Sequence, residues 1–166
     1  VMLGECGEVL VMDWGLAASV QKCGKAESLK GRTTSAGTPA YMSPEMARGD
    51  GDAIGRHSDQ YLLGAILFEI VAGRPPHVGD TTLQVLQKAS GNVISKTTTS
   101  GELLDIARKT MATEPRNRYR SVKEFQVAIR QYQQHMESVT LTHRAQEQLA
   151  EAKTTGEYEQ YARAGV

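Results

Sequence analysis

The sequence predicts a mainly α-helical domain that begins with a short β-hairpin and continues into a helical extension. Two patterns carry this prediction. Short apolar runs at residues 1–3 and 9–12, separated by the turn Gly4-Glu5-Cys6-Gly7, are typical of a hairpin. Apolar residues recur every three or four positions between residues 122 and 139, as on one face of an amphipathic helix.

Between the hairpin and that helix, the elements follow from local signals. Residues 18–36 are polar and without periodicity, which predicts a long loop. Ser43 is a suitable N-cap for a short helix that starts at Pro44. Residues 59–72 are apolar on nearly every face, so a buried central helix is expected there, ended by the turn residues 73–76.

Three further helical patterns come later in the chain. Smaller helices are expected around residues 83–89 and 103–111. Beyond residue 139 a second apolar stripe, at 141–152, continues the helical pattern until residues 154–156 break it. A short segment with Tyr158 and Tyr161 follows this break. The tail as a whole suggests the start of a helical-repeat array, and the alternative is a solvated or coiled linker.

Composition excludes several classes of protein. The 166 residues carry 19 Lys and Arg against 19 Asp and Glu, and a formal charge of zero gives no reason to expect a nucleic-acid partner. Cys6 and Cys23 form no Cys-x-x-Cys pair and no histidine lies at ligand spacing, so we expect no zinc site and favour a reducing, cytoplasmic setting. The longest apolar run, residues 61–72, falls short of the roughly 20 residues that span a bilayer. A membrane anchor elsewhere in a longer parent protein stays open.

The motif with the most chemistry is Asp13-Trp14-Gly15, which follows the second hairpin strand. A carboxylate at a strand end, with a glycine to free the backbone, suits a metal ion that bridges phosphates. Alone, however, Asp-x-Gly after a strand is most often an ordinary turn. The motifs that come later in the chain therefore decide its interpretation.

Four later motifs come after Asp13-Trp14-Gly15 in order and at sensible spacing. They are the run Gly37–Glu45 (Gly-Thr-Pro-Ala-Tyr-Met-Ser-Pro-Glu), the group Ser58-Asp59 with Tyr61 and Gly64, the turn Gly73–His77, and the run Glu114–Tyr119. Together the five motifs resemble the large lobe of a protein kinase, and most closely the bacterial serine/threonine kinases of the eukaryotic-like type. The resemblance covers about residues 1–132, with residues 13–45 as the activation segment, and leaves 133–166 as the helical extension. Trp14 stands where the family usually has Phe, and Ser43 where it usually has Ala.

The resemblance implies roles for individual residues. Asp13 would bind Mg²⁺, and Met2 would form the floor under the adenine of ATP, supported by Ile66 and Ile70. Thr38 would contact the catalytic Asp and favour Ser or Thr substrates. Two further residues, Glu45 and Arg118, would form a buried ion pair.

Asp59 and the polar loop also receive roles from the resemblance. Asp59 would accept backbone N–H groups of the catalytic loop, although a simple helix N-cap is compatible with the same position. Thr33, Thr34 and Ser35 lie in the loop and are possible phosphosites, because a phosphate there can order a loop against basic side chains. The four histidines suggest no catalytic role: His57 is expected to be structural, and His77, His135 and His143 to be solvated.

Several parts of a kinase active site are not in this sequence. It contains no Gly-rich loop, no strand lysine and no His-Arg-Asp catalytic loop. The resemblance places the catalytic base upstream of Val1, so no catalytic residue is assigned here and the isolated chain is expected to be inactive.

Two functions are compatible with these motifs. The expected function of the parent is transfer of the ATP γ-phosphoryl group to Ser or Thr of protein substrates, with Mg²⁺ and ATP as cofactors. The alternative is a pseudokinase or docking module, which would bind protein partners through the lobe or the C-terminal helices. The sequence upstream of Val1 would discriminate between them.

Overall fold

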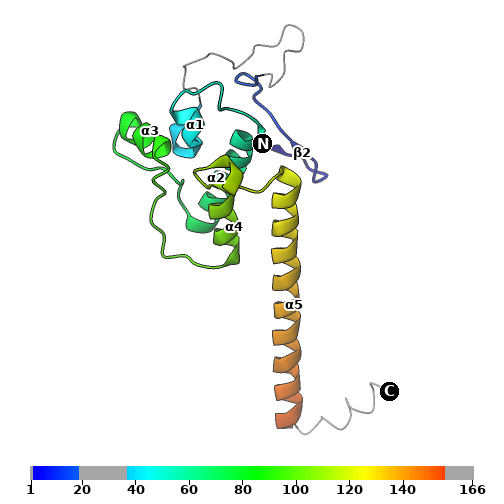
Figure 1. Ribbon diagram of the computed structural model, residues 1–166. Helices are drawn as coiled ribbons and strands as arrows, with labels where there is room; N and C mark the ends of the chain where they lie inside the picture. The colour runs from blue at the N-terminus through cyan, green and yellow to red at the C-terminus, as the bar shows by residue number, and fades with distance from the viewer. Residues whose placement is uncertain (1, 19–36, 156–166) are drawn as a thin grey trace. The chain divides into compact units, whose positions relative to one another are not determined.

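The computed structural model describes residues 2–18 and 37–155. Two units are present, residues 1–122 and 123–166, and each is considered by itself. The first unit contains the hairpin, all the short helices and the core (Figure 1). The second contains most of a single long helix, α5, which spans Val122–Thr155 and so continues past residue 132, where the kinase-like pattern was expected to end.

The hairpin is shorter than the apolar pattern suggested. Strand β1 (Met2–Leu3) pairs antiparallel with β2 (Val9–Leu10), with Met2 opposite Leu10. Val11 and Met12 were expected to belong to the second strand, but they lie beyond its end. Among the described residues two pairs face each other, Met2 with Leu10 and Leu3 with Val9.

Helix α2 (Arg56–Ala72) is the centre of the first unit. It starts three residues earlier than the apolar pattern indicated, because Gly55 is the N-cap and the Ser58 hydroxyl accepts the Gly55 N–H at 3.2 Å. It ends at Gly73, whose left-handed conformation (φ 71°) lets its N–H donate to the Glu69 carbonyl at 2.8 Å. The expected stop at residues 73–76 is therefore confirmed.

The main core forms where α2 packs on α4 (Glu102–Thr110), and the two helices lie side by side in Figure 1. Its fully buried residues come from both helices and from the residue that follows α4: Tyr61, Ala65, Phe68, Leu104, Ala107 and Met111. A smaller cluster joins the short helix α1 (Pro44–Ala47) to α3 (Thr82–Ser90) through Met42, Ala47 and Ala89. The second cluster packs the residue run 37–45 onto the rest of the unit.

One face of α2 is only partly covered by the described residues. Leu63, Ile66 and Ile70 are exposed, and Ile70 has 73% of its surface accessible. The prediction of a buried central helix therefore holds for the face that carries Tyr61, Ala65 and Phe68 and fails for this one. These positions include Ile66 and Ile70, to which the kinase resemblance assigned contacts beneath the adenine floor.

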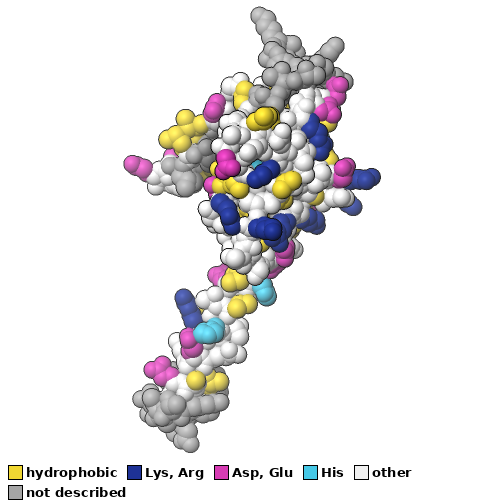
Figure 2. All heavy atoms as spheres, turned by 90° about the vertical axis from the view of Figure 1, so that its left-hand side faces the viewer, with side chains coloured by type: hydrophobic (Ala, Val, Ile, Leu, Met, Phe, Trp, Pro, Cys, Tyr) yellow, Lys and Arg dark blue, Asp and Glu magenta, His cyan; other side chains and the backbone are white. Residues whose placement is uncertain are grey.

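The remaining described elements are two 3₁₀ turns, η1 (Pro39–Tyr41) and η2 (Pro115–Asn117). Over the described residues no helix is long and apolar enough to cross a membrane. On the face shown in Figure 2, basic side chains are interspersed with acidic and apolar ones.

Gly64 allows α2 and α4 to approach closely, and we expect Gly64→Ala to destabilise the first unit by about 1–2 kcal/mol. A Cβ at this position would lie 2.7 Å from Cβ and 2.9 Å from Cγ2 of the buried Thr110. Overpacking of this kind costs roughly 1–3 kcal/mol, more than the roughly 1 kcal/mol that alanine gains in a helix. Urea unfolding followed by circular dichroism measures the difference.

Gly91→Ala is the matched control, because its added Cβ would meet no atom closer than 3.6 Å. We expect a change within about 0.5 kcal/mol for this variant. Equal stabilities for the Gly64 and Gly91 variants would contradict a steric role for Gly64.

Candidate functional site

The run Gly37–Glu45, which we call the docking segment, is held in a defined shape by its own backbone. Tyr41 and Met42 donate N–H groups to the carbonyls of Thr38 and Pro39, at 3.1 and 3.3 Å, and so form η1. Ser43 then caps α1, its hydroxyl accepting the Met46 N–H at 3.4 Å as the sequence predicted. Proline follows the cap residue in both turns, where its fixed φ favours the start of a helical turn.

The docking segment ends in a buried ion pair between Glu45 and Arg118, 73 positions apart in the chain. Arg118 donates through its two terminal nitrogens to Oε1 at 2.8 Å and Oε2 at 3.0 Å of Glu45. Both residues are buried, with 5% and 4% of their surfaces accessible. A two-point contact of this geometry matches the planar guanidinium and gives the pair a single orientation.

The remaining N–H groups of the Arg118 guanidinium also have hydrogen-bond acceptors. Nε donates to the Ala112 carbonyl at 2.9 Å, and the terminal nitrogens donate further to the carbonyls of His57 at 2.8 Å and Thr113 at 3.3 Å. The guanidinium also lies 5.0 Å from the centre of the Tyr61 ring. One side chain therefore ties together α1, the start of α2 and the segment after α4.

The Glu45 carboxylate is stabilised in its charged form. Burial by itself would raise its pKa, but hydrogen bonds from Arg118, from its own backbone and from Ser58, together with the Arg118 charge, lower the pKa to about 2. The Ser58 hydroxyl donates to Oε1 at 2.8 Å while accepting the Gly55 N–H. The Ser58 hydroxyl thus links the N-cap of α2 to the Glu45 carboxylate, and the sequence did not suggest this role.

Tyr41 attaches the middle of the docking segment to α2. Its hydroxyl donates to Oε2 of Glu69 at 2.8 Å, and this hydrogen bond, with burial and the Glu69 charge, raises the pKa of Tyr41. The segment is thus anchored at Tyr41 and again at Glu45. Thr38, by contrast, is exposed and its side chain makes no capping bond to η1.

A shallow groove of about 320 Å³ lies between the docking segment and the start of α3. At that end of α3 the Thr81 hydroxyl accepts the Gln84 N–H at 3.2 Å. The lining residues of the groove are Thr38, Pro39, Ala40, Gly79, Asp80, Thr81, Thr82 and Val85.

Asp13 lies on an exposed turn after the hairpin. Its backbone is left-handed (φ 65°), and its Oδ1 accepts the Gly15 N–H at 3.4 Å. The neighbouring Trp14 has 71% of its surface accessible and donates from Nε1 to the Val11 carbonyl at 3.1 Å. Among the described residues no group of three His, Cys, Asp or Glu side chains could hold a metal ion, and the role of Asp13 as a metal ligand stays a prediction.

Asp59 is not the helix N-cap that one interpretation of the sequence suggested. Gly55 occupies that position, and Asp59 lies one turn inside α2. Burial raises the pKa of Asp59, while the nearby His57 lowers it. Its assigned contact with a catalytic loop stays a prediction.

The other assigned residues are not brought together by the described structure. Met2 is exposed on β1, and the adenine-floor role stays a prediction. Thr33, Thr34 and Ser35 lie outside the described residues.

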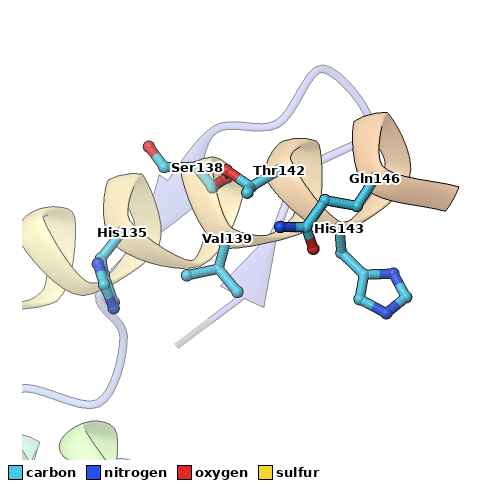
Figure 3. A pocket seen from close by; sticks show the side chains of 6 residues that line it. All are labelled: His135, Ser138, Val139, Thr142, His143 and Gln146. Carbon is cyan, nitrogen blue, oxygen red and sulfur yellow. The ribbon is translucent and has the colours of Figure 1, made fainter. Parts of the chain in front are cut away.

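A shallow depression lies along α5. Figure 3 shows its six lining side chains, all of which come from this one helix: His135, Ser138, Val139, Thr142, His143 and Gln146. Because a single helix face encloses nothing, this depression is no candidate for a small-molecule site. Protein partners along the C-terminal helix stay a prediction.

Sequence reasoning missed the role of His77. This residue was expected to be solvated, yet only 1% of its surface is accessible. Its ring is stacked on Tyr61, with the ring centres 6.3 Å apart and the planes 11° from parallel. The available sequence signal for this burial was the place of His77 directly after Pro75-Pro76, in the turn that ends a buried helix.

Comparison with known proteins points to one family. Residues 1–155 match the sequence profile described as "Protein kinase domain". The chain is 32% identical over 137 residues to a probable serine/threonine-protein kinase PknB of Bifidobacterium longum, and this match covers 80% of the chain. It is 33% identical over 134 residues to the serine/threonine-protein kinase PknB of Mycobacterium tuberculosis, covering 78% of the chain.

A shorter match has higher identity. It reaches 41% over 86 residues with the DNA damage-responsive serine/threonine-protein kinase RqkA of Deinococcus radiodurans, covering 52% of the chain and 12% of that protein. The chain spans about a fifth of the length of the two PknB relatives, 19% and 21%.

Proposed function

Because this chain belongs to the protein kinase family, we propose that the protein containing it transfers the γ-phosphoryl group of ATP to serine or threonine hydroxyls of other proteins. The observation that carries the proposal is the docking segment. Its two ends are shaped by proline-led turns, and it is anchored by Tyr41–Glu69 and by the buried Glu45–Arg118 pair. Such anchoring supports a rigid surface against which a flexible substrate is oriented.

The groove beside the docking segment is the proposed place for the substrate peptide. Its lining combines small and apolar residues with three threonines and Asp80, which offer hydrogen-bonding groups to a peptide, and the exposed Thr38 is one of these threonines. In the proposed arrangement, Thr38 bonds the catalytic Asp supplied by another part of the protein and places the acceptor hydroxyl. Asp59 supports that catalytic loop from α2.

Kinases of this family use ATP and a divalent metal, and we propose Mg²⁺ as the metal and Asp13 as one of its ligands. When bound, the metal neutralises charge on the phosphates. The exposed Asp13 carboxylate, held on its turn by the Gly15 N–H, fits a single position in a coordination sphere of oxygen atoms. Met2, on the neighbouring strand, is the proposed contact for the adenine.

We also propose a cytoplasmic location, where ATP is available and where a free, exposed thiol such as Cys6 persists in reduced form. Cell fractionation that finds the protein only outside the cytoplasm would contradict this location.

Replacing Asp13 tests the function directly. The complete protein should transfer phosphate from Mg²⁺-ATP to Ser- or Thr-containing substrates, and Asp13→Ala should reduce the rate by at least about a hundredfold, since even outer-sphere ligand changes cost up to that much. Transfer of radiolabelled phosphate measures both. Asp52→Ala, which removes an exposed acidic residue before α2, is the control and should retain activity.

The alternative function is a docking module without catalysis. It is favoured by the fact that the anchors of the docking segment all lie within this chain, whereas the described residues form no group that could hold a metal ion. A complete protein that transfers no phosphate, yet binds partners through the groove, would favour this alternative. Full activity in the Asp13 variant would instead contradict only the role of Asp13.

A further inference from the structure

His77 lies where three parts of the first unit meet: the docking segment, α2 and the segment after α3. Its backbone N–H donates to the Ala40 carbonyl at 3.2 Å. Its ring makes hydrogen bonds with the backbone of Met42 and, through Nδ1 at 3.0 Å, with the Val93 carbonyl. Ala40 and Met42 flank Tyr41, so His77 contacts the docking segment on both sides of its central anchor.

The opposite edge of the ring faces a second set of polar atoms. Nε2 of His77 lies 2.9 Å from the Tyr61 hydroxyl, which donates to Oδ1 of Asn92 at 2.6 Å. The Asn92 amide is oriented by its Nδ2, which donates to the Met111 carbonyl at 3.0 Å and to the Thr113 hydroxyl at 2.8 Å. Asn92 also has a left-handed backbone (φ 52°), a conformation that asparagine adopts more readily than most residues. The ring is therefore held from α2 and from both later segments.

A count of protons shows how strongly the ring is engaged. The Val93 carbonyl can only accept, so Nδ1 carries a hydrogen. In the neutral ring Nε2 is then an acceptor, and the Tyr61 hydroxyl has one hydrogen to share between Nε2 and Oδ1 of Asn92. Both ring nitrogens are thus engaged in the neutral form.

We propose that His77 is a positioning residue for the docking segment: its ring connects the Met42 backbone to Tyr61 and the Val93 carbonyl, and so holds the segment against α2. His77 touches neither substrate nor nucleotide in this proposal. It acts through the orientation of residues 40–42, which line or adjoin the groove. The catalytic consequence rests on the proposed function, whereas the conformational consequence does not.

The charged groups around the ring determine its response to pH. Tyr61 from α2 contacts it directly, while Arg118 lies over the Tyr61 ring and Glu45 pairs with Arg118. Burial lowers the pKa of His77, and the hydrogen bonds to Val93 and Met42 only partly oppose that effect. Stability linked to His77 is therefore complete above its ordinary pKa near 6.5 and is lost as the pH falls through the lower pKa of the folded state.

Hydrogen exchange on the 166-residue chain tests the conformational part. We expect His77→Phe, which keeps a flat ring but removes its hydrogen bonds, to speed amide exchange in residues 38–45 about threefold to tenfold. Amides of α4 should be unchanged. His77→Gln retains an N–H donor and should restore part of the protection, and it carries the test if the Phe variant fails to fold. His135→Phe, an exposed position on α5, is the control.

Unchanged amide exchange in residues 38–45 would overturn the proposal. Equal acceleration of exchange in residues 38–45 and in α4 would also overturn it, because a residue that only stabilises the core affects both segments alike. The pH profile adds an independent outcome. The loss of wild-type stability between pH 7 and pH 5 should be smaller in His77→Phe, and identical profiles would contradict the burial of a neutral His77 ring at this junction.

Kinetics of the complete protein test the catalytic part. His77→Phe should raise KM for a peptide substrate about threefold to tenfold, with smaller changes in kcat and in KM for ATP. A fall in kcat alone would contradict a positioning role. If the wild type transfers no phosphate, the proposed function fails, while the exchange experiment still decides the role of His77.

Discussion

Replacing Arg118 with alanine is expected to destabilise the first unit by about 3–5 kcal/mol, enough to unfold it at ordinary temperatures. The substitution leaves the Glu45 carboxylate buried without its partner, and it also removes donors to the carbonyls of Ala112, His57 and Thr113. Circular dichroism during thermal unfolding measures the effect. An unchanged melting temperature would show that the pair contributes nothing.

Two controls separate the ion pair from general effects of losing an arginine. Arg116→Ala removes an exposed arginine two residues away and should change stability by no more than about 0.5 kcal/mol. Arg118→Lys retains the charge but not the planar fork, so it should fall between the wild type and Arg118→Ala. A lysine variant as stable as the wild type would mean that charge alone suffices.

Acid should remove the same interaction in the wild type. Because the folded-state pKa of Glu45 is lowered from 4.5 to about 2, the stability from this pair is present above pH 4.5 and is lost as the pH falls toward 2. Glu45→Gln should lack this part of the acid response. A wild-type profile that is flat over that window would contradict the charge state assigned to Glu45.

The isolated 166-residue chain is expected to transfer no phosphate from Mg²⁺-ATP to a protein. Asp13 is an exposed single carboxylate, and a lone carboxylate makes a weak Mg²⁺ site. The sequence also contains no Gly-rich loop and no His-Arg-Asp catalytic base. Incubation with radiolabelled ATP, with the complete protein as the positive control, measures transfer.

Binding of the metal should fail for the same reason. Calorimetric titration of the chain with Mg²⁺ at millimolar concentration is expected to show no saturable heat. Measurable transfer by the purified chain, abolished by Asp13→Ala, would overturn this prediction and would mean that residues 1–166 form a working active site.

Motifs with a known physical role are recognisable from the amino-acid sequence alone. Glu45 and Arg118 were paired across 73 positions because the resemblance to protein kinases implies this pair, and the structure contains it. Ser43 as a cap and the stop at Gly73 were also predictable, since capping and left-handed turns depend on neighbouring residues only.

Other features depended on which segments meet in space. Apolar residues on α2 predicted burial on all sides, but Ile66 and Ile70 are exposed because the described residues cover that face only partly. Asp59 was compatible with an N-cap, but the Ser58 hydroxyl accepts the Gly55 N–H and moves the helix start to Gly55. The apolar pattern does not say which residues cover each face of α2, and the Asp59 pattern does not exclude a cap at Gly55 that the Ser58 hydroxyl completes.

The sequence by itself determined the order of the helices, because periodic patterns are local, and it indicated the family through motifs that resemble those of protein kinases. The two residues of the buried ion pair followed from that resemblance. Only the tertiary structure decided that His77 is buried between the docking segment and α2. Its partners Tyr61, Val93 and the Met42 backbone come from three separate segments. Such a hydrogen-bonded network depends on distances and directions between segments in space, and these cannot be predicted from the spacing of residues along the chain.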